Sequence, residues 1–139
     1  MLKSLFTTLT LSLLLLGCNA SEPTPATTLT KVAKSLEGTN WRLVSFGLTR
    51  MAVPPKASIS FKEGHYSGNG GCNGVGGNYV LEGDTLTLSA GFSTMMACPE
   101  LDLEHKYMKY LGSVTRYTIE GDLLNLRSDD QLLLRFKTE

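Results

Sequence analysis

Short runs of alternating apolar and polar residues, separated by turn-forming residues, constrain the fold of this chain more than any other feature of its sequence. Trp41 and Leu43 alternate with polar side chains in the first run, and Ile59 and Phe61 do so in the next. Alternation with a period of two is typical of a β-strand that buries one face. Further runs of this kind lie at residues 78–82, 85–88, 114–119, 123–126 and 132–136. The pattern therefore predicts a mostly antiparallel β-sheet, with Trp41, the only tryptophan, in its core.

Two of the predicted turns share the sequence Glu-Gly-Asp, at residues 82–84 and 120–122. A Gly-Asp pair between two alternating runs favours a β-hairpin. The flanks are similar as well, because a Tyr and an aliphatic residue precede each turn and a pair of Leu follows it. The sequence predicts two hairpins of similar construction, which either repeat a β-unit or use the same turn chemistry twice.

Residues 68–78 are rich in Gly and Asn. Both residues accept positive φ, so the chain can bend sharply and pass close to other backbone. We expect a tight bend between two strands, held in place by Cys72. A backbone nest that binds an anion is the alternative. The segment matches neither the phosphate-binding loop that ends in Gly-Lys-Ser/Thr nor the GxGxxG pattern.

One segment, at about residues 99–112, has the pattern of a helix. Pro99 suits the first helical position, and the acidic residues that follow suit the positive end of the helix dipole. Leu101, Met108 and Leu111 recur on one face, and Gly112 is a natural stop. The predicted fold class is thus α+β, with a curved, barrel-like antiparallel sheet of about seven or eight strands and one covering helix, an arrangement that limits exposed strand edges.

The N-terminal residues have the layout of an export signal. Lys3 precedes an apolar run that is too short to span a bilayer, which needs about 20 residues. The run ends in Leu15-Leu16-Gly17-Cys18, which resembles the lipobox of bacterial lipoproteins. That resemblance implies a signal peptide over residues 1–17 and a lipid on Cys18. An ordinary secretory signal with a chance Cys at its end is the alternative.

Residues 18–35 are rich in Thr, Pro and Ala, a composition that cannot bury enough surface to fold alone. We expect a flexible tether there, followed by one domain over residues 36–139. Asn19, in place of Asp after the lipidated Cys, favours the outer membrane by analogy with Gram-negative lipoproteins. The predicted location is therefore the outer membrane, with the domain facing the periplasm.

Lipidation of Cys18 leaves two cysteines, Cys72 and Cys98. In an oxidising compartment such a pair tends to form a disulfide, which stabilises by about 3–4 kcal/mol in the chain-entropy model. Free thiols are one alternative, and a metal site that adds His65 is another, although no metal-ligand spacing supports it. We therefore expect a disulfide and no metal or cofactor.

Charge and motif content argue against two function classes. The 13 Lys and Arg are matched by 13 Asp and Glu and form no basic cluster, so we expect no nucleic-acid partner. No GxSxG motif is present, and the candidate acids and bases read as solvated side chains, so we expect no enzyme activity. These candidates are His65, Asp102, Glu104 and His105.

Several separate blocks of the sequence resemble one family. They are Gly38–Leu43, Gly71-Cys72-Asn73, Thr94–Cys98, the helical residues Glu104, Tyr107 and Leu111, and the closing pattern over residues 124–136. Together these blocks are similar to the META domain, which is found in HslJ-type heat-inducible bacterial lipoproteins. The resemblance covers about residues 36–137. It implies a small α+β domain of the cell envelope, associated with heat response and drug tolerance, and it brings no catalytic residues.

The combined prediction is a membrane-anchored envelope lipoprotein whose domain binds and does not catalyse. Its partners would be the membrane, through the lipid, and an envelope protein, a peptide or an apolar ligand. The alternative is an inhibitor of lysozyme or of a protease, because such lipoproteins are also small, disulfide-bonded and β-rich. Residues 66–69 resemble, weakly, a Ser-Gly loop that could enter an enzyme cleft.

Overall fold

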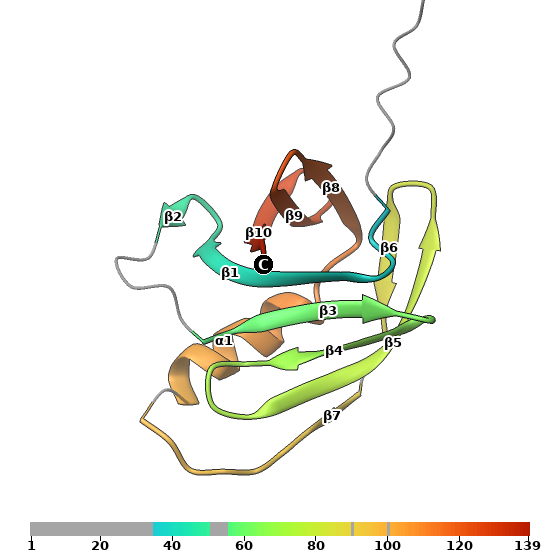
Figure 1. The fold of residues 1–139 in the computed structure, drawn as a ribbon. Coiled ribbons are helices and arrows are strands. Elements are labelled where there is room, and N and C mark those ends of the chain that lie inside the picture. Colours follow the sequence, from blue (N-terminus) through green and yellow to red (C-terminus); the bar gives the residue numbers. More distant parts are fainter. Residues whose placement is uncertain (1–34, 51–55, 90, 100) are drawn as a thin grey trace, which may run out of the picture. The chain divides into compact units, whose positions relative to one another are not determined.

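A computed structural model describes residues 35–50, 56–89, 91–99 and 101–139. Cys18, the tether up to residue 34 and the Val53-Pro54-Pro55 break all lie outside these ranges, so the predictions made for them stay predictions. The described residues hold one helix and ten strands, all in one antiparallel sheet (Figure 1). The strands are β1 (Thr39–Phe46), β2 (Thr49–Arg50), β3 (Ser58–Lys62), β4 (His65–Asn69), β5 (Gly74–Glu82), β6 (Thr85–Leu88), β7 (Phe92–Ser93), β8 (Arg116–Glu120), β9 (Leu123–Ser128) and β10 (Gln131–Thr138).

Eight of the strands form a ring of hydrogen-bonded neighbours. The order β10-β9-β8-β6-β5-β4-β3-β1 is closed by direct pairing of β1 with β10. The seam between β6 and β8 is short, with Thr85 opposite Arg116 as its one paired position. An ion pair of 3.3 Å between Arg116 and Asp84 reinforces this seam. The fold class expected from the sequence is confirmed, with a ring-like sheet that is not a strict barrel.

The alternating runs place their apolar members inside the ring. Trp41, Leu43, Ile59 and Phe61 are each at most 1% exposed. Leu124, Leu126, Leu134 and Phe136 fill the core from the last two strands. Both Glu-Gly-Asp segments form the predicted hairpins, β5–β6 and β8–β9, and the glycine at the centre of each has φ of +64°. Local patterning thus settles which face of each strand is buried.

The helix α1 (Leu101–Leu111) starts and ends slightly inside the predicted range. It lies beside the end of β1 and the start of β3 (Figure 1). Tyr107 is fully buried, and its hydroxyl donates to the Ser58 carbonyl at 3.0 Å. The ring of Tyr107 also packs edge-on against Phe136. The centre of the buried face is therefore Tyr107, with Glu104 and Leu111 beside it, whereas the predicted members Leu101 and Met108 are only half-buried.

The start of the domain is fixed by polar contacts. The Tyr79 hydroxyl donates to the Glu37 carboxylate, which also accepts from the Glu63 backbone N–H. These hydrogen bonds lower the pKa of Glu37. Desolvation and the bond to Glu37 raise the pKa of Tyr79 to about 12. Leu36, one residue earlier, is 1% exposed and packs in the core.

Candidate functional site

Cys72 and Cys98 form a disulfide, with their Cα atoms 6.0 Å apart. Cys72 lies in the bend between β4 and β5, and Cys98 lies just before α1. The bond therefore links the Gly-rich bend to the segment that leads into the helix. Among the described residues, no group of three or more His, Cys, Asp or Glu could hold a metal ion.

The disulfide makes a direct prediction for the purified protein. Under denaturing, non-reducing conditions neither Cys72 nor Cys98 should react with an alkylating reagent, and mass spectrometry should show one peptide pair joined through them. Reduction before alkylation serves as the control, since it should expose both thiols. Two alkylated thiols in protein that has never been reduced would contradict the assignment.

Asn73 is the centre of a buried polar cluster next to the disulfide. Its backbone N–H donates to Glu104 at 2.7 Å, and its side-chain amide donates to the other carboxylate oxygen at 3.0 Å. Its side-chain oxygen accepts from the Thr94 hydroxyl at 2.9 Å and from the Met96 backbone N–H at 2.7 Å. Gly70 lies so close that a Cβ there would be 2.8 Å from the Glu104 side chain. We call Asn73, Thr94, Met96 and Glu104 the Asn73 cluster.

This cluster corrects one prediction from the sequence. Glu104 was expected at a solvated position on the helix, but it is 5% exposed, and Asn73 is 2% exposed. A carboxylate on the buried face of a helix is unfavourable unless it has a hydrogen-bond partner. The partner of Glu104 is Asn73, which lies 31 residues earlier in the chain. His65, Asp102 and His105 are exposed, as expected.

Three of the five sequence blocks on which the family resemblance rests meet at the Asn73 cluster and the disulfide. Gly71-Cys72-Asn73, Thr94–Cys98 and Glu104 meet in space through the disulfide and the hydrogen bonds of Asn73. All four hydrogen-bonding positions of the Asn73 amide group, two donors and two acceptors, are used. These residues hold the segment 92–98 in place, and that segment presents Phe92, Met95 and Met96 to solvent.

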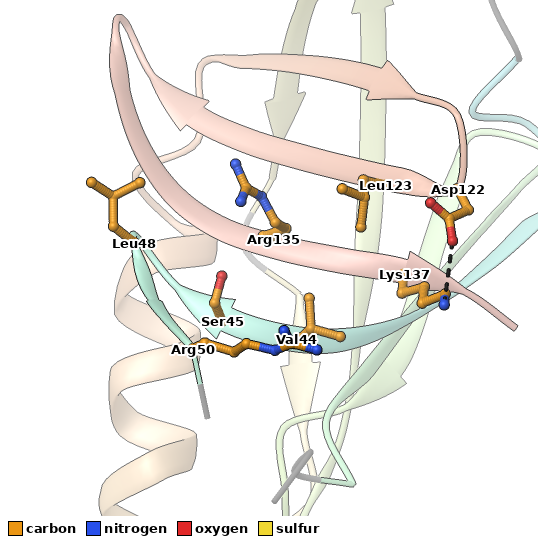
Figure 2. Close-up of a pocket in the computed structure, with 8 residues that line it drawn as sticks. All are labelled: Val44, Ser45, Leu48, Arg50, Asp122, Leu123, Arg135 and Lys137. Carbon is orange, nitrogen blue, oxygen red and sulfur yellow. Dashed lines mark ion pairs between the residues drawn. The ribbon is translucent and has the colours of Figure 1, made fainter. Parts of the chain in front are cut away.

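A hollow of about 330 Å³ opens on the outer face of the ring, over β9, β10, β1 and β2 (Figure 2). We call it the groove. Its apolar lining residues are Val44, Leu48 and Leu123, and its polar ones are Ser45, Arg50, Asp122, Arg135 and Lys137. A second hollow, beside Phe92, includes Gly77 and Gly91 in its lining, and His65 and Tyr66 are its titratable lining residues. The groove is therefore the better candidate for specific recognition.

A row of polar residues crosses five strands through the groove. The row runs Thr118, Asn125, Arg135, Ser45 and Arg50, and each residue is the direct cross-strand partner of the next. Directly opposite residues share one face of a sheet, with Cβ atoms roughly 4.5–5.5 Å apart. We call this arrangement the polar row. It brings together side chains from β8, β9, β10, β1 and β2.

Within the polar row, Asn125 holds Arg135 in a fixed orientation. The Arg135 Nε donates to the Asn125 side-chain oxygen at 2.7 Å, and the Asn125 amide donates to the Thr118 hydroxyl at 3.2 Å. Asn125 is 2% exposed, so these bonds are shielded from water. Figure 2 shows the Arg135 side chain extending from β10 toward β9, among the residues that line the groove.

The charge of the groove is unbalanced. Lys137 pairs with Asp122 at 3.3 Å, so these two charges compensate each other. Within the ranges that the structure describes, no acidic side chain forms an ion pair with Arg50 or Arg135. The groove thus contains two guanidinium groups that form no ion pair with a carboxylate of the described residues, an arrangement that favours an anionic ligand.

No local pattern in the sequence indicated this groove. Arg135 lies in the run Leu132-Leu133-Leu134-Arg135-Phe136, where it reads as the solvated member of a strand. Ser45 and Arg50 are 90 and 85 residues earlier in the chain. Only the register of five strands places them in one row. In contrast, residues 66–69, which resembled an inhibitory loop, lie inside β4 and are paired to strands on both sides.

Comparisons with known proteins agree with this architecture. The sequence pattern of the META domain matches residues 34–139. The NMR structure of a protein from Burkholderia xenovorans is similar, with a TM-score of 0.64, 26% sequence identity and coverage of 75% of this chain and 83% of that chain. A second NMR structure, also 26% identical, has a TM-score of 0.55 and covers 71% of this chain and 87% of that chain.

A third solved structure shows the fold alone. This DUF4847 family protein from Bacteroides vulgatus is 15% identical, with a TM-score of 0.55, and the match covers 71% of this chain and 91% of that chain. A search of curated proteins found no significant match.

Proposed function

This chain belongs to the META domain family, and from that premise we propose that it is a lipid-anchored protein of the cell envelope that acts by binding, not by catalysis. The observation that carries the proposal is the groove with its polar row. An arginine that is oriented by a buried asparagine, beside apolar side chains and without an ionic partner among the described residues, is suited to hold a ligand. The lining offers no nucleophile paired with a base.

Attachment to the membrane supports this role physically. A tethered domain is confined to a thin layer, which raises its effective concentration toward partners in that layer. The proposed anchor is the lipid on Cys18, at the outer membrane, with the domain facing the periplasm. The apolar run before Gly17-Cys18 supports it. Among the described residues there is no helix with the length and apolar character needed to cross a bilayer. The proposed biological role is tolerance of heat or of drugs that cross the envelope.

The anchor can be tested by metabolic labelling. Cells that produce the wild-type protein should incorporate a palmitate analogue into it, whereas Cys18→Ser should abolish the label because the thiol that carries the lipid is gone. Cys72→Ser is the matched control, since it removes a different thiol and should leave the label intact. Equal labelling of wild type and Cys18→Ser would rule out this anchor.

The groove can be tested by site-specific photo-crosslinking in cells. A photoreactive residue at Leu48, which is 88% exposed at the groove, should give a discrete adduct, and Arg135→Gln should reduce it severalfold. A photoreactive residue at Val80, which is 58% exposed on β5 away from the groove, is the control. Arg116→Gln removes a charge elsewhere and should have no effect. Adducts that form at Val80 but not at Leu48 would contradict binding through the groove. An adduct yield at Leu48 that is unchanged by Arg135→Gln would contradict it as well.

A further inference from the structure

We infer that the groove recognises the C-terminal residue of a peptide, when that residue has an apolar side chain. This inference rests on the proposed binding function and specifies its ligand. Three features of the groove carry it: an oriented arginine, a serine hydroxyl whose proton is already used, and an apolar lining. Each feature sets one chemical requirement for the ligand.

The first requirement is a carboxylate. Because the Arg135 Nε donates to Asn125, the two Nη groups at the other edge of the guanidinium are not used by that bond, and Arg135 lines the groove. That edge presents parallel N–H donors, the geometry that binds a carboxylate in a bidentate manner. Arg50, two positions along the polar row, adds a second positive charge. Asp122 does not oppose the anion, because it is paired with Lys137.

The second requirement is an N–H donor. Ser45 lies between the two arginines in the polar row and is 4% exposed. Its hydroxyl donates to the Gly47 carbonyl at 3.0 Å, so its single proton is already used. Toward a ligand, the Ser45 oxygen can therefore only accept. A ligand that met this oxygen with a carboxylate or a phosphate oxygen would leave two acceptors in contact, whereas an amide N–H would satisfy it.

The third requirement is an apolar group of limited size. Val44, Leu48 and Leu123 line the groove, and Leu48 is otherwise 88% exposed. Figure 2 shows Val44 and Leu123 on one side of Arg135 and Leu48 on the other, so a ligand side chain placed against either group would remove apolar surface from water on both partners. The groove volume of about 330 Å³ suits one or two residues of a peptide, not a folded partner.

One chemical unit carries all three groups. In the last residue of a peptide, the carboxylate, the amide N–H and the side chain are all attached to a single Cα. The group that binds the carboxylate and the group that binds the N–H must then lie next to each other. Arg135 and Ser45 meet this condition, because they are direct cross-strand partners. A fatty acid has a carboxylate and an apolar chain but lacks the N–H. An inorganic phosphate lacks both the N–H and the apolar group.

Binding of defined peptides to the full-length protein in zwitterionic lipid nanodiscs tests the inference. The probe is fluorescein-labelled Gly-Ala-Ala-Leu with a free C-terminus, followed by fluorescence anisotropy. We expect binding to weaken at least tenfold for the C-terminal amide, which lacks the charge, and for the peptide with N-methyl-leucine, which lacks the last N–H. A peptide that ends in Asp should also bind at least tenfold more weakly. Decanoate should compete poorly.

Protein variants complete the test. Arg135→Gln should weaken binding of the free-carboxylate peptide at least tenfold, and Arg135→Lys should weaken it as well, because lysine keeps the charge but loses the planar fork. Arg116→Gln is the matched control and should bind like the wild type. If Arg135→Gln does not fold by circular dichroism, Arg50→Gln on the exposed β2 takes its place, and the ligand series still applies to the wild type.

The outcomes separate the inference from the proposed function. Equal binding of the carboxylate and amide peptides, or of the N-methyl peptide, would overturn the inference. Efficient competition by decanoate would overturn it too, in favour of an acyl ligand. If no peptide binds but crosslinking at Leu48 still depends on Arg135, the groove binds another ligand, so the inference fails while the proposed function stands. If both experiments fail, the proposed function fails with it.

Discussion

Replacing Trp41 by alanine should cost the domain about 3–5 kcal/mol of unfolding free energy, the range for deleting a large aromatic side chain from a core. Trp41 has 0% exposure on β1, the strand that pairs with both β3 and β10. Its indole N–H donates to the Thr39 hydroxyl at 2.6 Å, so the substitution also removes a hydrogen bond. Small domains have only about 5–15 kcal/mol of stability in total.

Urea unfolding followed by circular dichroism measures this effect. Leu48→Ala is the matched control, because Leu48 is 88% exposed and its truncation should change stability by less than about 0.5 kcal/mol. Trp41→Phe keeps an aromatic ring and should fall between the two. A Trp41→Ala protein with an unchanged urea midpoint would show that this side chain is not packed in the core.

Replacing Glu104 by alanine should destabilise the domain by about 2–4 kcal/mol. The Glu104 carboxylate accepts two hydrogen bonds from Asn73, and both residues are buried. Without it, the Asn73 backbone N–H and one of the two side-chain N–H groups lose their acceptors. A buried polar group without a partner costs about 1–3 kcal/mol. Glu104→Gln keeps most of the volume but turns one acceptor into a donor that faces a donor, so it should also destabilise.

Asp102 provides the comparison for this experiment. It lies on the same helix and carries the same charge, but it is exposed, so Asp102→Ala should have little effect on stability. The two variants would be indistinguishable if both acids were solvated, as the sequence suggested. Loss of Glu104 should also release the segment 92–98, because Asn73 holds Thr94 and Met96. Faster hydrogen exchange at Met96 would report that release.

Local sequence patterns predicted most of the secondary structure. The period of two located the strands around Trp41, Ile59 and Leu124, because the side chains of a strand alternate between faces regardless of what the strand pairs with. Gly-Asp turns predicted both hairpins, since the turn requires a residue that accepts positive φ. The helix boundaries followed within two residues, whereas the bend predicted over residues 68–78 is confined to residues 70–73, because the rest of that segment lies in β4 and β5.

The sequence could not predict the role of Glu104 or the groove. Helical periodicity marks the stripe on which Glu104 lies but says nothing of the asparagine that approaches it from a bend 31 residues earlier. The polar row depends on the register of β8, β9, β10, β1 and β2, including a bulge in β1 between Leu43 and Ser45. A shift of one residue in any of these pairings would turn the side chains of that strand to the other face.

Short-range sterics and burial can be read from the amino-acid sequence, and they indicate which residues form strands and turns, which faces are apolar, and which two cysteines are available to pair. Three further features appear only in the folded protein: β1 and β10 close the ring, Glu104 is buried against Asn73, and Arg135 and Ser45 are cross-strand neighbours. These are contacts between residues far apart in the chain. Their partners are chosen by strand register and packing, which no local pattern encodes.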